Sequence, residues 1–300
     1  MTDNRRGALE MALAMTISGT IGWFVLMAGR PPLDVVFWRC IFGAVALGLY
    51  CLATGAFKVR MTWQQAALAV FGGVAIVVNW LMLFAAYRHA SVAVATAVYN
   101  VQPFIVLAFG ALMFGEKITL AKVGWMALAF TGVVLIVMEK PSAAYVGAYF
   151  GLGIALTLAA SVGWAIATIT TKKLTGVPPQ TIAFIHVVTG IVILAPFAEL
   201  GTLPSGAMSW SMLVALGFLH TGIMYALMYS AVQKLPTYLQ GALTFINPVV
   251  AVLTDVFALG HVLHPSQIAG IAVILTAAAG TTFLPGLVAR YGAARRARAA

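Results

Sequence analysis

The sequence predicts an all-α integral membrane protein with ten transmembrane helices, arranged as two inverted five-helix repeats around a central cavity. Three observations predict this fold: the scarcity of charge, the recurrence of long apolar segments, and the similarity of the two halves of the chain. Only 8% of the 300 residues are charged and 62% are hydrophobic, whereas soluble domains carry about 25% charged residues. We therefore expect lipid to cover most of the surface.

Ten apolar segments are long enough to cross the hydrocarbon core of a bilayer, which takes roughly 20 helical residues. Short connections separate them, and none has room for a soluble domain. The predicted spans are 8–29, 32–53, 64–87, 92–114, 121–138, 148–172, 179–200, 208–230, 238–258 and 266–286.

Lys and Arg are distributed unevenly between the two sides of these spans. The net charge is +10, but the basic residues form no stripe of the kind that binds nucleic acid. Of the 17 Lys and Arg, 13 fall on the side of both termini and 4 on the other side. Basic residues accumulate on the cytoplasmic side of membranes. We therefore expect no nucleic-acid partner, and a multi-pass membrane protein with both termini in the cytoplasm.

The two halves of the chain share proline, glycine and aromatic positions. A shift of 145 residues aligns Pro103 with Pro248, and a shift of 141 aligns Trp23 with Trp164, each of which follows a glycine. Each half has five spans, an odd number, so the second half enters the membrane from the opposite side. Inverted repeats of this kind are typical of secondary transporters, whose substrate site lies at the repeat interface near mid-membrane. The expected domains are a first repeat over 1–140 and a second repeat with a basic tail over 141–300.

Pro103 and Pro248 lie near the middle of the fourth and ninth predicted helices. A proline inside a helix removes one backbone hydrogen bond and displaces the carbonyl four residues earlier, here that of Tyr99 or Thr244. An unpaired carbonyl is costly in lipid, so such breaks face protein or a wet cavity. We therefore expect these helix-break residues to face a central cavity. The alternative is that the prolines only kink two packed helices.

Polar and aromatic side chains within the spans are the candidates for substrate binding. Neutral amides both donate and accept hydrogen bonds, which suits the two ends of a zwitterion, and aromatic rings offer stacking surface to an apolar solute. Because Trp and Tyr also gather at membrane interfaces whatever the function, an interfacial role remains the alternative for the tryptophans. The candidates are Trp23, Asn79, Tyr99, Asn100, Gln102, Trp164, Tyr225, Gln240 and Asn247.

Ionisable residues inside the apolar spans are few, and such residues are functional candidates by default. Arg39 and His186 occupy equivalent positions in the two halves, where a structural hydrogen-bonding role competes with a substrate role. The other three are Glu10, His220 and Asp255.

Signatures of enzymes and of nucleotide-driven pumps are missing from the sequence. It contains no H-E-x-x-H, no G-x-S-x-G and no P-loop, the motifs that carry metal, nucleophile or phosphate chemistry. We therefore expect no enzymatic activity, no cofactor, no metal site and no ATP-driven transport by this chain alone.

One segment resembles a known family. Gln102-Pro103-Phe104, followed by Phe-Gly-Glu-Lys-Ile-Thr at 114–119 and then by Gly124 and Gly132, is similar to the drug/metabolite transporter superfamily, specifically its ten-helix EamA-type exporters. The second copy departs from the pattern, with His261 where the family often has Glu. The resemblance implies export of amino acids, metabolites or drugs from a bacterial cytoplasm. The richness in Trp and Tyr is similar to the aromatic-amino-acid exporter branch.

The expected function is therefore secondary, alternating-access export of amino acids, with aromatic ones favoured. The alternative is a broad-specificity drug/metabolite exporter. The expected partners are a small-molecule substrate and the lipid bilayer, and we expect a functional monomer.

The predicted orientation can be tested with reporters fused to the C-terminus. The bias of Lys and Arg places this end in the cytoplasm, so a cytoplasm-active reporter is expected to work and a periplasm-active one to stay silent. The opposite pattern would contradict the orientation and the even number of spans.

Overall fold

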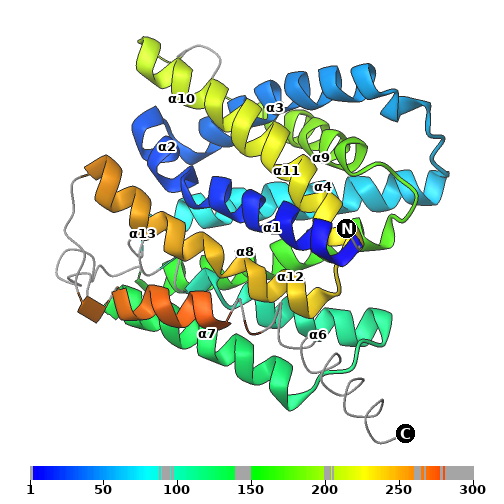
Figure 1. The fold of residues 1–300 in the computed structure, drawn as a ribbon. Helices are drawn as coiled ribbons and strands as arrows, with labels where there is room; N and C mark the ends of the chain where they lie inside the picture. Colours follow the sequence, from blue (N-terminus) through cyan, green and yellow to red (C-terminus); the bar gives the residue numbers. More distant parts are fainter. Residues whose placement is uncertain are drawn as a thin grey trace, which may run out of the picture.

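A computed structural model describes residues 3–87, 89, 95, 98–138, 150–198, 204, 206–259, 265, 266, 268–277 and 280, and every regular element within them is a helix. Figure 1 shows these helices gathered side by side in one bundle. The predicted basic tail lies outside the described residues, as do Arg88, Lys140, His261, the start of the span 92–114 and the end of the span 266–286.

Six helices in the described part of the chain are long and apolar enough to cross a membrane. Each overlaps one of the predicted spans, and shorter apolar helices occupy 102–114, 120–135 and 268–277. The total of ten spans stays a prediction. The six are Asp3–Ala28, Pro32–Thr54, Trp63–Ala86, Gly151–Lys173, Pro179–Phe197 and Ala207–Lys234.

The helices divide between the two halves of the chain. The first half contains α1 (Asp3–Gly19), α2 (Ile21–Ala28), α3 (Pro32–Thr54), η1 (Ala56–Lys58), α4 (Trp63–Ala86), α6 (Gln102–Phe114) and α7 (Leu120–Met138). The second half contains α8 (Phe150–Lys173), α9 (Pro179–Leu194), η3 (Ala195–Phe197), α10 (Ala207–Gly217), the π-helix η4 (Phe218–Ile223), α11 (Met224–Lys234), α12 (Thr237–Thr244) and α13 (Ile246–Leu259).

Local sequence signals explain where these helices begin and end. Pro32 and Pro179 each occupy the first position of a helix, where the missing N–H is not needed. Thr62 and Gln65 form a capping box at the start of α4, each side chain pairing with the backbone of the other. Three helices end on a left-handed glycine, the usual C-terminal stop: Gly29, Gly55 and Gly115, with φ of 63°, 69° and 64°.

The main packing contacts join the first half to the second half. α4 packs along α8, α1 along α11, α3 along α9, and α6 against α12, and Figure 1 shows α1 and α11 side by side at the centre of the bundle. A large apolar core lies between these pairs, and a smaller one joins α7 to α13 and 268–277. The junction between the halves is therefore the centre of the described structure.

The contact between α4 and α8 depends on a glycine. A Cβ atom at Gly163 would lie 2.9 Å from the carbonyl oxygen of Ala75 and 3.2 Å from Cβ of Asn79. Small residues allow membrane helices to approach this closely. The close approach lets Nδ2 of Asn79 donate to the carbonyl oxygen of Ala160 on α8, at 2.6 Å.

Gly163→Ala is expected to lower thermal stability in detergent. The added methyl group meets backbone at sub-contact distance, and overpacking of this kind costs roughly 1–3 kcal/mol. Gly151→Ala on the same helix is the matched control, because nothing lies within 4 Å of its Cβ position. Equal melting temperatures for the two variants would contradict the close approach of α4 and α8.

Candidate functional site

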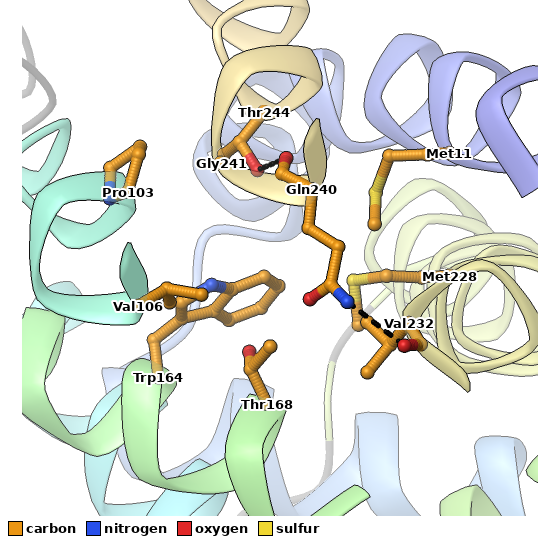
Figure 2. Close-up of a pocket in the computed structure, with 10 residues that line it drawn as sticks. All are labelled: Met11, Pro103, Val106, Trp164, Thr168, Met228, Val232, Gln240, Gly241 and Thr244. Carbon is orange, nitrogen blue, oxygen red and sulfur yellow. Dashed lines mark hydrogen bonds between the residues drawn. The ribbon is translucent and has the colours of Figure 1, made fainter. Parts of the chain in front are cut away.

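A pocket lies where helices from both halves meet. It is lined from α1, α6, α8, α11 and α12, and Figure 2 shows the indole of Trp164 reaching across it toward Gln240. Its empty volume of about 260 Å³ includes the space of its open mouth, and the enclosed part is far smaller. The pocket is therefore narrow in this state. Its lining residues are Met11, Pro103, Val106, Trp164, Thr168, Met228, Val232, Gln240, Gly241 and Thr244.

Gly241 allows α12 to cross α6 beside the pocket. A Cβ atom at this position would lie 3.1 Å from Cβ of Pro103 and 3.2 Å from its carbonyl oxygen. The two helix-break regions predicted from the sequence contribute to one wall because the backbones approach so closely. This wall contains Pro103 and Thr244.

The two prolines lie at the beginnings of helices and not in the middle of continuous ones. α6 begins at Gln102, after a turn at Asn100 and Val101, so that Pro103 is its second residue. α12 ends at Thr244 and α13 begins at Ile246, which places Pro248 in the first turn of α13. The reason is that the first turn of a helix tolerates a residue without an N–H donor.

The carbonyl of Tyr99, which was expected to be free, has a partner. Oγ of Ser161 on α8 donates to it at 3.4 Å. The hydroxyl of Tyr99 accepts from Nδ2 of Asn79 at 2.9 Å. The first contact ties Tyr99 to α8, one helical turn before Trp164, and the second ties it to α4.

The side-chain amide of Gln240 has a defined orientation. Its Nε2 donates to the carbonyl oxygens of Val232 at 2.9 Å and Leu235 at 2.7 Å. Because two carbonyls can only accept, the nitrogen must face them. Oε1 therefore points the other way, and Figure 2 shows it on the side of Trp164 and Thr168. Gln240 is 2% exposed, and this oxygen has no hydrogen-bond partner among the described residues.

Two further amides share this property. Oδ1 of Asn79 and Oε1 of Gln102 are also buried without a partner in the described part of the chain. An unpaired buried polar atom costs about 1–3 kcal/mol. Three of the amides predicted to bind substrate thus each leave a carbonyl oxygen unpaired.

A buried cluster around Arg39 lies beside the pocket helices. Sequence reasoning identified the arginine but not the residues that surround it. Arg39 is 1% exposed. Its Nε donates to Oγ1 of Thr221 at 2.8 Å, and its guanidinium lies 4.3 Å from the ring centre of Trp80, an arrangement stabilised by cation–π attraction. His186 pairs separately, through Nδ1 with the hydroxyl of Tyr229 at 2.7 Å. A basic residue inside an apolar span was the signal for both sites, but it did not reveal their partners.

One end of the pocket helices is held by an ion pair centred on Glu116. Its Oε1 lies 2.7 Å from Nζ of Lys172, and its Oε2 accepts from the hydroxyl of Thr237 at 2.6 Å. Nζ of Lys172 also donates to the carbonyl oxygen of Leu235, at 3.0 Å. Burial raises the pKa of the Glu116 carboxyl, but the hydrogen bonds from Lys172 and Thr237 outweigh burial, and the pKa lies below its ordinary 4.5.

A second ion pair lies on the other side of the short connection between α11 and α12. Glu10 of α1 accepts from Nζ of Lys234 at 2.6 Å and from Oγ of Ser230 at 2.8 Å. Both ion pairs join the first half of the chain to the second, and both meet at the short connection between α11 and α12. Within the described residues, no group of three His, Cys, Asp or Glu side chains could hold a metal ion.

Comparison with known protein families identifies the class of protein to which this chain belongs. The model of the EamA-like transporter family matches residues 5–138 and again residues 151–283. The chain belongs to this family. It is therefore a membrane transporter with several membrane-crossing helices.

Individual relatives of this EamA-like transporter are similar over most of their lengths. The uncharacterized transporter YxxF of Bacillus subtilis is 30% identical, over 95% of this chain and 91% of the relative. The probable amino-acid metabolite efflux pump of Salmonella typhimurium is 27% identical, over 66% and 70%. The threonine/homoserine exporter RhtA of Escherichia coli is 24% identical, over 75% and 74%. A solved crystal structure superposes with a TM-score of 0.82 at 22% identity, covering 93% of this chain and 96% of that one, and so shares the fold.

The predicted substrate-binding residues of this EamA-like transporter divide into two groups. Trp164 and Gln240 line the pocket, as does Pro103, and Asn79, Tyr99, Asn100 and Gln102 lie around the break before Pro103. These four and the remaining three lie outside the lining. Tyr225 accepts from Nε1 of Trp80 at 2.9 Å, Asn247 donates to Ser18 at 2.9 Å, and Trp23 packs edge-on against Phe24 on α2.

Proposed function

We propose that this EamA-like transporter is a secondary carrier that exports amino acids, with aromatic ones favoured, across the bacterial inner membrane by alternating access. The observation that carries the proposal is the pocket between the halves, where one aromatic ring and one unpaired amide oxygen lie together. The ring of Trp164 offers stacking surface, and Gln240 offers a polar contact. Methionine and valine side chains complete a wall suited to an apolar side chain.

The relatives support amino acids as the substrate class. Two of the similar proteins are named for amino-acid metabolite efflux and for threonine/homoserine export. The preference for aromatic side chains rests on Trp164 alone among the lining residues. A zwitterion carries its own balancing charge, so a pocket lined by neutral groups suits it.

We further propose that the chain forms ten spans in two inverted repeats, over 1–140 and 141–300. The packing supports this arrangement, because α4 contacts α8 as α11 contacts α1, while α3 contacts α9 and α6 contacts α12. Such exchanged pairs are expected when a pseudo-two-fold axis relates two halves. The two consecutive family matches support the same division.

Alternating access requires a barrier that opens on one side at a time. The ion pairs of Glu116 with Lys172 and of Glu10 with Lys234 join the two halves at one end of the pocket helices. With both termini in the cytoplasm, this end is the cytoplasmic one. We assign these pairs as the cytoplasmic gate, which is closed in this state.

A broad drug exporter is the less supported alternative. A pump for hydrophobic cations favours a carboxylate in its cavity, but no acidic residue is among the described residues that line this pocket. Glu10 is engaged with Lys234, and the side chain of Asp255 lies outside the described part of the chain.

The aromatic preference is tested by efflux of phenylalanine and of threonine from liposomes that contain purified variants. Trp164→Ala is expected to slow phenylalanine export more than threonine export, because stacking contributes roughly 0.5–1.5 kcal/mol beyond buried area. Gln102→Ala is expected to slow the export of both substrates equally, because it removes about 1 kcal/mol of hydrogen-bonding free energy. Trp63→Ala is the control, since Trp63 is 81% exposed. Equal loss of both substrates in Trp164→Ala would refute the aromatic preference.

The gate is tested by labelling Thr244→Cys with a membrane-impermeant maleimide from the cytoplasmic side, after replacement of Cys40 and Cys51. Glu116→Gln removes the charge that holds Lys172, a loss of about 1–2 kcal/mol that raises the open population roughly 5- to 30-fold. Labelling is therefore expected to become faster. Asp34→Asn is the control, because its ion pair with Arg30 lies within one half. Unchanged labelling in Glu116→Gln would remove the gate assignment.

A further inference from the structure

The wall of the pocket that Gln240 and Thr244 form presents hydrogen-bond acceptors. Oε1 of Gln240 faces the cavity, because Nε2 is held by the carbonyls of Val232 and Leu235. The hydroxyl of Thr244 donates its proton to the backbone oxygen of Gln240 at 2.9 Å, and Figure 2 shows this bond directly above the amide. Toward the pocket, Thr244 is therefore left with lone pairs only.

We propose that this wall is the binding site for a primary ammonium group of the substrate. One N–H donates to Oε1 of Gln240, a second is within the reach of Oγ1 of Thr244 as the pocket closes on its ligand, and the indole of Trp164 covers the carbon attached to nitrogen. The inference rests on the proposed function, because it places the transported molecule in this pocket. It goes further by requiring an amine and by making the carboxylate dispensable for binding.

A carboxylate does not suit this wall. Carboxylate oxygens only accept hydrogen bonds, and two facing acceptors repel each other. Among the residues that the structure describes, no lysine or arginine lines the pocket, so none of them compensates the desolvation of an anion. The unpaired oxygen of Gln240 instead favours a donor, which removes the cost of leaving it unpaired.

The contact is a hydrogen bond and not a simple attraction for positive charge. The lining residues in the described part of the chain include no acidic side chain, so a cation without N–H groups leaves Oε1 of Gln240 as unpaired as before. The wall thus separates primary amines from quaternary ammonium ions of similar size. This property distinguishes it from a general site for hydrophobic cations.

Four ligands with one phenyl ring test the proposal on the purified full-length protein. Phenylalanine and 2-phenylethylamine carry a primary amine, 3-phenylpropanoate lacks it, and trimethyl(2-phenylethyl)ammonium keeps the charge without N–H. Affinities are measured from ligand-dependent thermal stabilisation. We expect the first two to bind about 10- to 100-fold more tightly than the last two, the range for a hydrogen bond to a charged group. Equal binding of the carboxylate or of the quaternary ion, or no binding by any of the four, overturns the proposal.

Gln240→Met tests the residue, and the chain offers a matched control. Nε2 of Gln233 also donates to two backbone carbonyls, those of Leu174 at 3.1 Å and Val177 at 3.0 Å, but Gln233 is not part of the lining. Both methionine variants lose the same kind of structural bond. Only Gln240→Met is expected to lose the ratio between amine and carboxylate affinity.

The ratio does not depend on the amount of folded protein, so partial instability leaves the test valid. If Gln240→Met and Gln233→Met lose the ratio equally, Gln240 is only a structural tie and the proposal fails. If amines bind through Gln240 but liposomes export no amino acid, the proposed function fails while the ammonium site stands. If amino acids are exported and 3-phenylpropanoate competes as well as 2-phenylethylamine, the ammonium site fails alone.

Discussion

The carbonyl oxygen of Leu235 holds the candidate site together. It lies at the end of α11, where helical carbonyls have no partner within the helix, and the following Pro236 favours the extended backbone seen at Leu235, with φ −98° and ψ 147°. Nζ of Lys172 and Nε2 of Gln240 both donate to this oxygen, at 3.0 and 2.7 Å. A cation near a helix C-terminus also complements the helix dipole.

This shared acceptor connects the ion-paired end of the pocket helices to the pocket. One face of the Gln240 amide binds the connection between α11 and α12, and the opposite face looks into the pocket. Lys172 binds the same connection and, through Glu116, the start of α12. A ligand that engages Gln240 therefore acts on a group that also takes part in the proposed gate. Hydrogen bonds in such chains polarise one another, which gives binding and closure a common physical basis.

Sequence reasoning succeeded where a local signal carries the information. Long apolar runs predicted six helices that the structure contains. Of the two paired prolines, Pro103 lines the pocket and Pro248 is not among its lining residues. Sequence reasoning failed where the outcome depends on the rotation of a helix about its axis. Tyr225 faces Trp80 and not the pocket, while Gln240 faces inward. Glu10 pairs with Arg6 one helical turn away and also with Lys234, which lies 224 residues away. No pattern along the chain indicates the second pairing.

The π-helix at Phe218–Ile223 rotates the side chains of α11 about the helix axis relative to those of α10. A π-turn accommodates one residue more than an α-turn, and one residue corresponds to about 100° of rotation. The side chains of α11 are therefore out of phase with those of α10. A single helical wheel drawn over 207–234 assigns the residues of one of these two helices to the wrong face. Thr221 reaches Arg39 from within this wide turn, so the phase shift and the anchoring of the buried arginine have a common origin.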